Sequence, residues 1–456
     1  MQKSLEWAQL TFGDAQLGDA RRVRRLLSVA AGVCARPAGR VTRVFERSAH
    51  REGAFRLVEN AAVEASEIAR ASHRATARRC ANASTVFVAV DQTSLSFSDR
   101  AGTKFGRTGG SDAVHRGMFA MSGLAVDSSG TTLGPTALEY WVRPDERCPK
   151  WKQDKRPAHE RESHLWHRAI DSTMEVMRVH APECTPWFQL DRGADFGDVL
   201  ALAHQQSLRI TVRSAHDRAI EGRTNGYLWQ RMKSQPVLGQ MFVNVPARAE
   251  RPARVAQLNV RAQRWRFRVA KAGKQRRSVW VEMTAVFVTE PNKRDGIEWM
   301  LWTTYPVHNF EDAIEVVRGY SMRWRIEEFH RAWKSGHCDI ESSQLRSVDA
   351  VQRWGAITAA VAARAEHLKL RSRAEPQAPA SSELSQHEID AAILLSETKK
   401  HRPGDNITLQ QAVDLIARIG GYIGKSSGGP PGTVTITRGL DRIDGAAKVL
   451  AIQRSG

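Results

Sequence analysis

The chain has 456 residues, with 68 Lys and Arg against 49 Asp and Glu, which gives a formal net charge of +19. A hydrophobic content of 41% with 26% charged residues is typical of globular proteins and excludes a wholly disordered chain. The longest uncharged apolar runs reach about ten residues, whereas a membrane-spanning helix needs about 18. The basic excess predicts a polyanionic partner, and the length predicts roughly two to four domains.

The N-terminal residues and the cysteines indicate a compartment. The first residues lack the apolar stretch of a secretory signal. The five cysteines are scattered, odd in number and never arranged as a C-x-x-C pair, so they predict reduced thiols rather than disulfides or a zinc site. We therefore expect a cytoplasmic protein with no membrane partner.

Three regions follow one another along the chain. Residues 1–66 contain Ala-rich amphipathic stretches and are predicted to form a helical domain. Residues 67–370 alternate short β-rich runs with helical segments, which predicts an α/β layer fold. Within this region, residues 214–310 show β-like alternation and turns, which is typical of an inserted β-rich module. Residues 371–456 are predicted to form a helical C-terminal domain after a linker-like stretch, Arg371–Gln386.

The central region contains the elements of one sheet with covering helices. Strands are predicted at Thr85–Val90, Gly117–Val126, Thr131–Val142, Pro186–Leu190 and Leu208–Val212. Helices are predicted at Ser163–His180, Phe196–His204, Glu311–Lys334 and Asp349–Lys369. If residues 214–310 are an insertion, the order of these elements matches an RNase H-like arrangement.

About half of the net charge lies in residues 248–277, which contain eleven basic residues and a single acid, Glu250. The basic residues are Arg248, Arg251, Arg254, Arg261, Arg264, Arg266, Arg268, Lys271, Lys274, Arg276 and Arg277. The segment Arg264–Val269 alternates strictly, so a strand there would point its apolar residues inward and three guanidinium groups outward. We interpret this as a phosphate-binding row, and the alternative is a solvated basic strand face.

A second basic region lies at the N-terminus. Residues 1–80 contain fifteen basic and eight acidic side chains. Arg21 and Arg22 begin a basic run that precedes the helical stretch Leu26–Val33. Two separate basic regions predict more than one contact with a long polyanion.

Two aspartates, Asp91 and Asp191, follow predicted strands. In an open α/β sheet the carboxyl ends of the strands form the edge where ligands bind. Either aspartate taken alone is more often a turn former or a helix cap than a catalyst.

The predicted helix Glu311–Lys334 supplies a third acid. On a continuous helix, Tyr320, Arg323, Glu327 and Lys334 share one stripe about 60° wide. The simple alternative is a solvated face with an Arg323–Glu327 ion pair. Neighbouring Glu328 points about 100° away from Glu327, which predicts a structural ion-pair partner.

Together, the two aspartates and the stripe predict a metal-dependent phosphoryl-transfer site. Three carboxylates, Asp91, Asp191 and Glu327, can hold two Mg²⁺ ions about 3.5–4 Å apart. Tyr320, Arg323 and Lys334 could bind neighbouring phosphates without competing for metal.

The spacing Tyr-x₂-Arg-x₃-Glu-x₆-Lys resembles the signature of bacterial DDE transposases of the insertion-sequence-four family, which includes the Tn-five transposase. The resemblance spans residues 5–370 with order preserved. It continues in Leu17–Arg22, Glu52–Arg56, Asp91–Ser96, Asp191–Asp195, Val212–Ser214 and Trp299–Leu301.

The resemblance implies a cut-and-paste transposase with an RNase H-like core, a DNA-binding N-terminal domain and a dimerising C-terminal domain. Such an enzyme binds double-stranded DNA at transposon ends and cleaves it with Mg²⁺ or Mn²⁺ through a hairpin. It joins the ends to target DNA as a homodimer on the bacterial nucleoid. The implied metal ligands are Asp91, Asp191 and Glu327, and the implied DNA contacts are Tyr320, Arg323, Lys334, Trp299, Arg213, Arg21 and Arg22.

The resemblance assigns Trp299 to a flipped base, on which an indole ring can stack. The alternative for Trp299 is an ordinary core residue in a strand. Residues 433–456 contain no Trp, although the family has Trp-rich helices there, so the dimer contacts are not predicted. Alternative functions are a non-catalytic DNA-binding inhibitor or repressor, and a nuclease that cuts without strand transfer.

Overall fold

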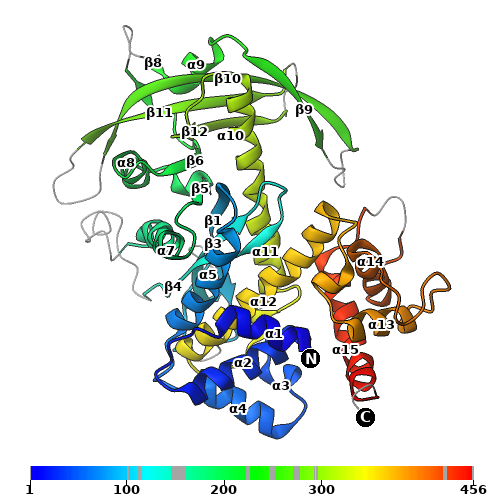
Figure 1. Ribbon diagram of the computed structural model, residues 1–456. Helices are drawn as coiled ribbons and strands as arrows, with labels where there is room; N and C mark the ends of the chain where they lie inside the picture. Colours follow the sequence, from blue (N-terminus) through cyan, green and yellow to red (C-terminus); the bar gives the residue numbers. More distant parts are fainter. Residues whose placement is uncertain are drawn as a thin grey trace.

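The structure is a computed structural model with a large mixed sheet and helices on both of its faces (Figure 1). It describes residues 2–99, 102–109, 115–144, 161–221, 226–245, 252–270, 278–291, 293, 296–424 and 429–453. In Figure 1 the N-terminal and C-terminal helices lie at one end, and strands β10 and β11 lie at the other. The mixed α/β architecture agrees with the predicted fold class.

The N-terminal region is helical, as predicted. Its helices are α1 (Gln2–Phe12), α2 (Ala20–Ala35), α3 (Val41–Val44), α4 (Ser48–Val58) and α5 (Ala65–Cys80). Helix α2 begins at an N-cap, Asp19, whose carboxylate accepts a hydrogen bond of 2.7 Å from the backbone N–H of Arg21. Helices α2, α4 and α5 pack against α12, and most of the buried apolar residues of this region share one core with it, while Ala77 and Cys80 of α5 belong to a second core.

Five strands form the central part of the sheet, in the spatial order β4-β3-β1-β5-β6. They are β1 (Thr85–Ser96), β3 (Arg116–Val126), β4 (Thr132–Trp141), β5 (Thr185–Leu190) and β6 (Arg209–Arg213). β3 is antiparallel to β1 and β4 to β3, whereas β5 and β6 run parallel to β1. All five predicted strands are therefore present, and β1 extends beyond its predicted end at Val90 to Ser96.

The strands within residues 214–310 continue this same sheet. β12 (Glu298–Thr303) pairs with β6 antiparallel, and β11 (Ser278–Thr289) and β10 (Arg254–Ala270) extend the sheet further. The remaining strands are β2 (Gly106–Arg107), β7 (Ala219–Ile220), β8 (Gly226–Tyr227) and β9 (Gly239–Val245). All twelve strands of the described residues belong to one sheet. A short helix, α9 (Leu228–Lys233), also lies in this region, so the predicted β-rich module is not purely β.

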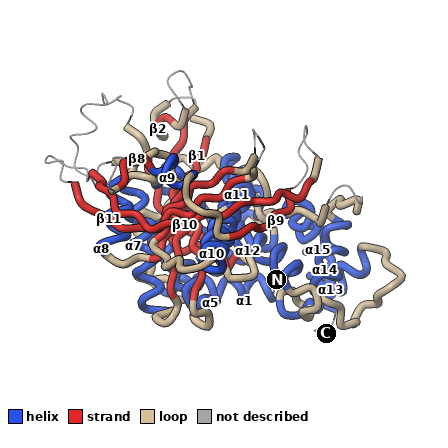
Figure 2. Tube along the Cα trace, turned by 90° about the horizontal axis from the view of Figure 1, so that it is seen from above, coloured by secondary structure: helices blue, strands red, loops and turns tan. Residues whose placement is uncertain are grey.

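Alternate residues of β1 face two different cores, and this divides the molecule into layers. Val86, Val88 and Val90 pack with α7 (His164–His180) and α8 (Gly197–Gln205). Phe87 and Ala89 pack on the other face with α10 (Phe310–Met322), α11 (Trp324–Lys334) and α12 (Val348–Ala374). Figure 2, seen from above, shows the strands lying between these helices.

The C-terminal region forms a smaller helical unit with its own buried cluster. Its helices are α13 (Gln386–Leu395), α14 (Leu409–Ile419) and α15 (Thr433–Gln453). The predicted linker, Arg371–Gln386, is packed structure. Helix α12 continues to Ala374, and Ala380 and Leu384 are buried in the C-terminal cluster. No helix in the described residues has both the length and the apolarity that crossing a membrane requires.

Two further boundaries differ from the sequence prediction. The first strand does not end before Asp91, because its antiparallel pairing with β3 continues to Ser96 after its parallel pairing with β5 stops at Val90. The predicted helix Glu311–Lys334 is divided at Arg323. There the backbone makes i→i+3 hydrogen bonds, from Arg323 N–H to Tyr320 O and from Ile326 N–H to Arg323 O, which tighten the chain into a 3₁₀-like turn.

Helix α12 connects the N-terminal helices to the helices beside the sheet. The indole N–H of Trp354 donates to Gly39 O at 2.9 Å, and the guanidinium of Arg353 donates to the carbonyl oxygens of Val58 and Val63. On its other side, Trp333 of α11 donates to Thr358 Oγ1 at 3.0 Å. α12 thus positions α11 with respect to the N-terminal region.

We predict that Trp354→Ala lowers the free energy of unfolding by about 3–5 kcal/mol, because it removes a fully buried ring and leaves a cavity. Trp354→Phe keeps most of the ring and loses only the hydrogen bond to Gly39, so its cost should be about 1–2 kcal/mol. Urea unfolding followed by fluorescence measures both values. Equal losses in the two variants would contradict this account.

Candidate active site

Asp91 and Asp191 lie next to each other at the edge of the sheet where two parallel strands stop pairing. The last residue pair between β1 and β5 is Val90 with Leu190, and each aspartate is the next residue along the chain: Asp91 within β1 and Asp191 directly after β5. The Asp91 carboxylate accepts a hydrogen bond of 2.8 Å from the N–H of Gln92. The Asp191 carboxylate accepts one of 2.7 Å from the N–H of Gly193, which fixes the turn after β5.

Helix α11 brings Glu327 to the same place through Arg323. One guanidinium nitrogen of Arg323, Nη1, lies 3.2 Å from Asp91 Oδ2 and 3.4 Å from Glu327 Oε1. The side chains of Arg323 and Asp91 are largely buried, whereas 38% of the Glu327 side chain is exposed. The Arg323–Glu327 ion pair named in the alternative interpretation is present, but Arg323 is largely buried and also pairs with Asp91.

The electrostatics of this cluster are unusual. Burial raises the pKa of Asp91 to about 7, and the negative charges of Asp191 and Glu327 act in the same direction. Arg323 opposes them but does not restore the ordinary value. The three carboxylates lie in a partly buried site, and the single positive charge of Arg323 does not neutralise them.

Tyr320, Arg213 and Trp299 border the cluster. The pKa of the Tyr320 phenol is raised by burial, while the charges of Arg323 and Arg213 act to lower it and that of Asp191 to raise it. Trp299 of β12 is half-buried, and its ring meets the Tyr320 ring edge-on with centroids 5.5 Å apart. Arg213 ends β6 and donates to Glu298 O at 3.2 Å.

Three other predicted contacts lie elsewhere. Lys334 ends α11 and sits 3.7 Å from Glu341, whose carboxylate also accepts from the N–H of Ser96 at the far end of β1. On α2, Arg21 is exposed. The guanidinium of Arg22 donates to Leu17 O at 2.9 Å and Ala62 O at 3.3 Å, so it connects parts of the N-terminal region.

The alternation predicted for the basic strand is present in β10. Phe267 and Val269 are buried, and the three arginines between and before them are exposed. Arg264 pairs with Glu282 at 2.8 Å and Arg266 with Glu221 at 3.6 Å. Part of this row is therefore neutralised within the sheet, and residues 248–251 and 271–277 lie outside the described residues.

Two groups hold this edge in place, and sequence reasoning gave no role to the first of them, Asp195. The side chain of Asp195 is fully buried, accepts from the backbone N–H groups of Ala215 and His216, and pairs with Arg218 at 2.6 Å. It thereby fixes the loop after β6. Its position at the end of the motif Asp191–Asp195 was the available signal.

The second group supports α11 from behind. Glu328 accepts from Arg325 at 2.8 Å and lies 3.5 Å from the buried ammonium of Lys369 on α12. Arg325 also donates to Gly130 O at 3.1 Å. The prediction that Glu328 is a structural ion-pair partner is confirmed. Its ion pairs fix α11, and so fix the position of Glu327 on another side of the same helix.

The residues of the cluster fit divalent metal ions by their chemistry. Carboxylate oxygens are the ligands that Mg²⁺ and Mn²⁺ prefer, and added positive charge would relieve the repulsion that raises the pKa of Asp91. In the described residues no three His, Cys, Asp or Glu side chains are close enough to coordinate one ion together. The cationic position between Asp91 and Glu327 is taken by Arg323 instead.

Such an arrangement can support phosphoryl transfer. Its carboxylates can hold hard cations, while Arg323, Arg213 and Tyr320 provide donors for phosphate oxygens at the same edge. The half-buried ring of Trp299 lies beside these donors and can contact an apolar group.

One comparison with known proteins gives independent information. Residues 4–63 match the model of a family described as transposase DNA-binding. The match covers helices α1–α4, the region whose basic excess predicted a polyanionic partner. It supports a transposase, with DNA as its partner.

The raised pKa of Asp91 predicts a pH-dependent stability. Its folded pKa of about 7 exceeds the unfolded value near 3.9, so the folded state binds more protons between these values and loses stability as pH rises. Asp91→Asn removes this loss. The unfolding free energy of the variant relative to wild type should rise from pH 5 to pH 8 by at most about 3 kcal/mol, because the rise ends near the folded pKa of about 7.

Urea unfolding at both pH values, without divalent ions, measures this difference. A difference that stays constant or falls with pH would show that Asp91 ionises normally in the folded protein.

Proposed function

We propose that this protein is a cut-and-paste DNA transposase of the DDE type, similar to the insertion-sequence-four family, with Asp91, Asp191 and Glu327 as its catalytic carboxylates. The observation that carries the proposal is the contact of Arg323 with both Asp91 and Glu327, together with the nearby charge of Asp191, which helps to raise the pKa of Asp91. The match of residues 4–63 to transposase DNA-binding domains supports the same class of function.

The arrangement of the sheet supports an RNase H-like core. Three antiparallel strands, β4, β3 and β1, are followed by two parallel strands, β5 and β6, with α7 and α8 between and after them. Asp91 comes from β1, Asp191 directly follows β5, and Glu327 comes from α11. This is the order of elements that the sequence led us to expect.

Asp91, Asp191 and Glu327 would hold two Mg²⁺ or Mn²⁺ ions. When bound, such ions activate a water or a 3′-hydroxyl and stabilise the leaving oxygen. Arg323 would then exchange part of its contact with Asp91 and Glu327 for a phosphate oxygen, since a guanidinium binds either partner in the same planar geometry. Tyr320 and Arg213 would fix the neighbouring phosphates, and Lys334 would bind further along the strand.

The remaining parts of the proposal concern DNA recognition. Helices α1–α4 would bind the transposon ends, with the exposed Arg21 contacting phosphate and Arg22 holding the domain together. Trp299 would stack on a flipped base during hairpin formation, because its half-buried ring lies beside the phosphate donors. The active complex would be a homodimer on the bacterial nucleoid that joins both ends to target DNA.

The first experiment tests cleavage. Purified protein with Mg²⁺ should cut DNA that carries the inverted repeats flanking its own gene. Asp91→Ala, Asp191→Ala and Glu327→Ala should each reduce cleavage by at least about a hundredfold, because each removes electrostatic stabilisation of the transition state. DNA binding, measured by gel shift, should persist in all three.

Glu311→Ala is the matched control, because Glu311 is an exposed acid in the first turn of α10. It should cut normally. Retained cleavage in any of the three site variants would remove that residue from the assignment. Tight binding of the ends without cleavage in any metal would indicate a non-catalytic repressor, and cleavage without joined product would indicate a nuclease.

The second experiment tests Trp299. Trp299→Ala should slow hairpin formation relative to the first nick by about tenfold or more, since base–aromatic stacking contributes about 1–3 kcal/mol per base. Trp299→Phe should recover part of this rate because it restores a stacking face. Trp280→Ala, which removes a partly exposed indole from the neighbouring strand β11, should leave the ratio unchanged. A Trp299→Ala variant with an unchanged ratio would make Trp299 a packing residue.

A further inference from the structure

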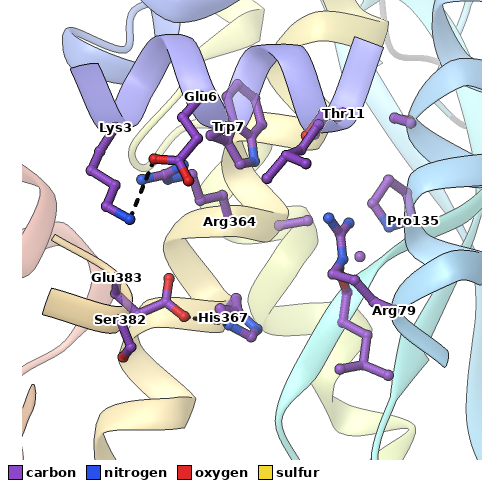
Figure 3. Close-up of a pocket in the computed structure, with 16 residues that line it drawn as sticks. Lys3, Glu6, Trp7, Thr11, Arg79, Pro135, Arg364, His367, Ser382 and Glu383 are labelled. Atoms are coloured by element: carbon purple, nitrogen blue, oxygen red, sulfur yellow. Dashed lines mark hydrogen bonds and ion pairs between the residues drawn. The ribbon is translucent and has the colours of Figure 1, made fainter. Parts of the chain in front are cut away.

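A cavity of about 220 Å³ lies where three parts of the chain meet, away from the carboxylate cluster. Its walls come from α1, α5, the start of β4, α12 and the short helix η4 (Ala380–Ser382). Figure 3 shows Lys3 and Trp7 of α1 on one side and His367 and Glu383 on the opposite side, with Arg364 of α12 between them and Arg79 on a further wall.

The acids of this cavity are already neutralised. Glu6 lies 3.3 Å from the ammonium of Lys3. Glu383 accepts from both His367 and Arg371, and although burial acts to raise its pKa, these bonds and charges hold that pKa at about 2. Both carboxylates are therefore already paired with other cations and do not neutralise Arg79 or Arg364.

The arginines have no acidic partner within the described residues. Arg79 uses two of its five N–H donors, one to Leu133 O at 2.8 Å and one to Thr76 Oγ1 at 3.1 Å. The Arg79 side chain is exposed to solvent at the mouth of the cavity, which leaves its other N–H donors accessible to a ligand. Arg364 lies over the Trp7 ring, 5.4 Å from its centroid.

The backbone leaves room for Arg79 at one position. Gly134 has φ +143°, and a Cβ atom there would lie 2.3 Å from Thr76 Oγ1 and 2.7 Å from Arg79 Nη2. A glycine is thus required for both the backbone conformation and the placement of the guanidinium. The wall also contains apolar side chains, among them Leu10, Leu133 and Pro135.

We propose that this cavity is a binding site for a small organic phosphate, with Arg79 as the anchor of the phosphate group and Arg364 as a second cation that favours a dianion. A guanidinium with free N–H donors matches phosphate oxygens in a planar fork. The apolar side chains of the wall suit the organic part of the ligand. The volume corresponds to roughly seven waters, so the cavity would hold the phosphate and the adjoining part of a phosphate monoester, and the rest of a nucleoside monophosphate would extend through its open side.

The site differs from the proposed DNA surface because it is concave and narrow. A double helix cannot enter a cavity of this size, whereas a free phosphate ester can. A ligand held here would contact α1, α12 and η4 together, and so would stabilise the N-terminal and C-terminal regions against the centre of the chain.

The test is isothermal titration calorimetry of the full chain with a nucleoside monophosphate, inorganic phosphate, the unphosphorylated nucleoside and a short DNA duplex. We expect the monophosphate to bind, the nucleoside not to bind, and duplex DNA not to compete. Arg79→Gln should weaken binding of the monophosphate by about tenfold or more, which is the loss expected for a charged hydrogen bond. Arg78→Gln is the matched control, because Arg78 lies outside the cavity and pairs with Asp14.

A second pair of variants keeps the test valid if Arg79→Gln fails to fold. Leu10 and Leu5 are both exposed on α1, but only Leu10 lines the cavity. Leu10→Glu should weaken binding of the monophosphate by repulsion, and Leu5→Glu should not. The proposal is overturned if no phosphate compound binds at millimolar concentration, if duplex DNA displaces the ligand, or if both control variants lose as much affinity as their partners.

Discussion

The repulsion among three carboxylates at one edge of the sheet is the interaction on which the rest of this structure depends. Asp91, Asp191 and Glu327 are brought together although burial and mutual repulsion raise the pKa of Asp91 to about 7. A cluster of this kind lowers the stability of the fold above neutral pH unless cations compensate it. Arg323 supplies part of that positive charge, and the proposed metal ions would supply the rest.

The surrounding architecture holds this unfavourable cluster in place. The two aspartates are fixed by the register of parallel strands, which ends at Val90 and Leu190. Glu327 is fixed less directly, because α11 is supported by ion pairs from Glu328 to Arg325 and Lys369 and by packing on α12. α12 in turn is bonded to the N-terminal region through Arg353 and Trp354. The helices that match transposase DNA-binding domains are therefore connected to the carboxylate cluster through packed structure.

The basic excess has more than one use in the folded chain. Part of it is paired internally, as for Arg264 with Glu282 and Arg22 with two carbonyl oxygens. Other cations, such as Arg79 and Arg364, face a cavity without acidic partners in the part of the chain that the structure describes. Net charge alone therefore overestimates how many arginines are available to DNA.

The sequence by itself determined the mixed α/β class, the five central strands and the residue types of the candidate site, because apolar periodicity and the end of a buried strand are local properties. It could not determine where α10 ends, because the 3₁₀-like turn at Arg323 depends on the fit between two helices and the sheet. Nor could it show that β1 continues past Asp91, since that strand is extended by its pairing with β3. Which arginines are paired, why the pKa of Asp91 is raised and how a cavity forms between α1, α12 and η4 were decided only by the tertiary structure. Each of these depends on the charges and surfaces that distant segments bring within a few ångströms of one another.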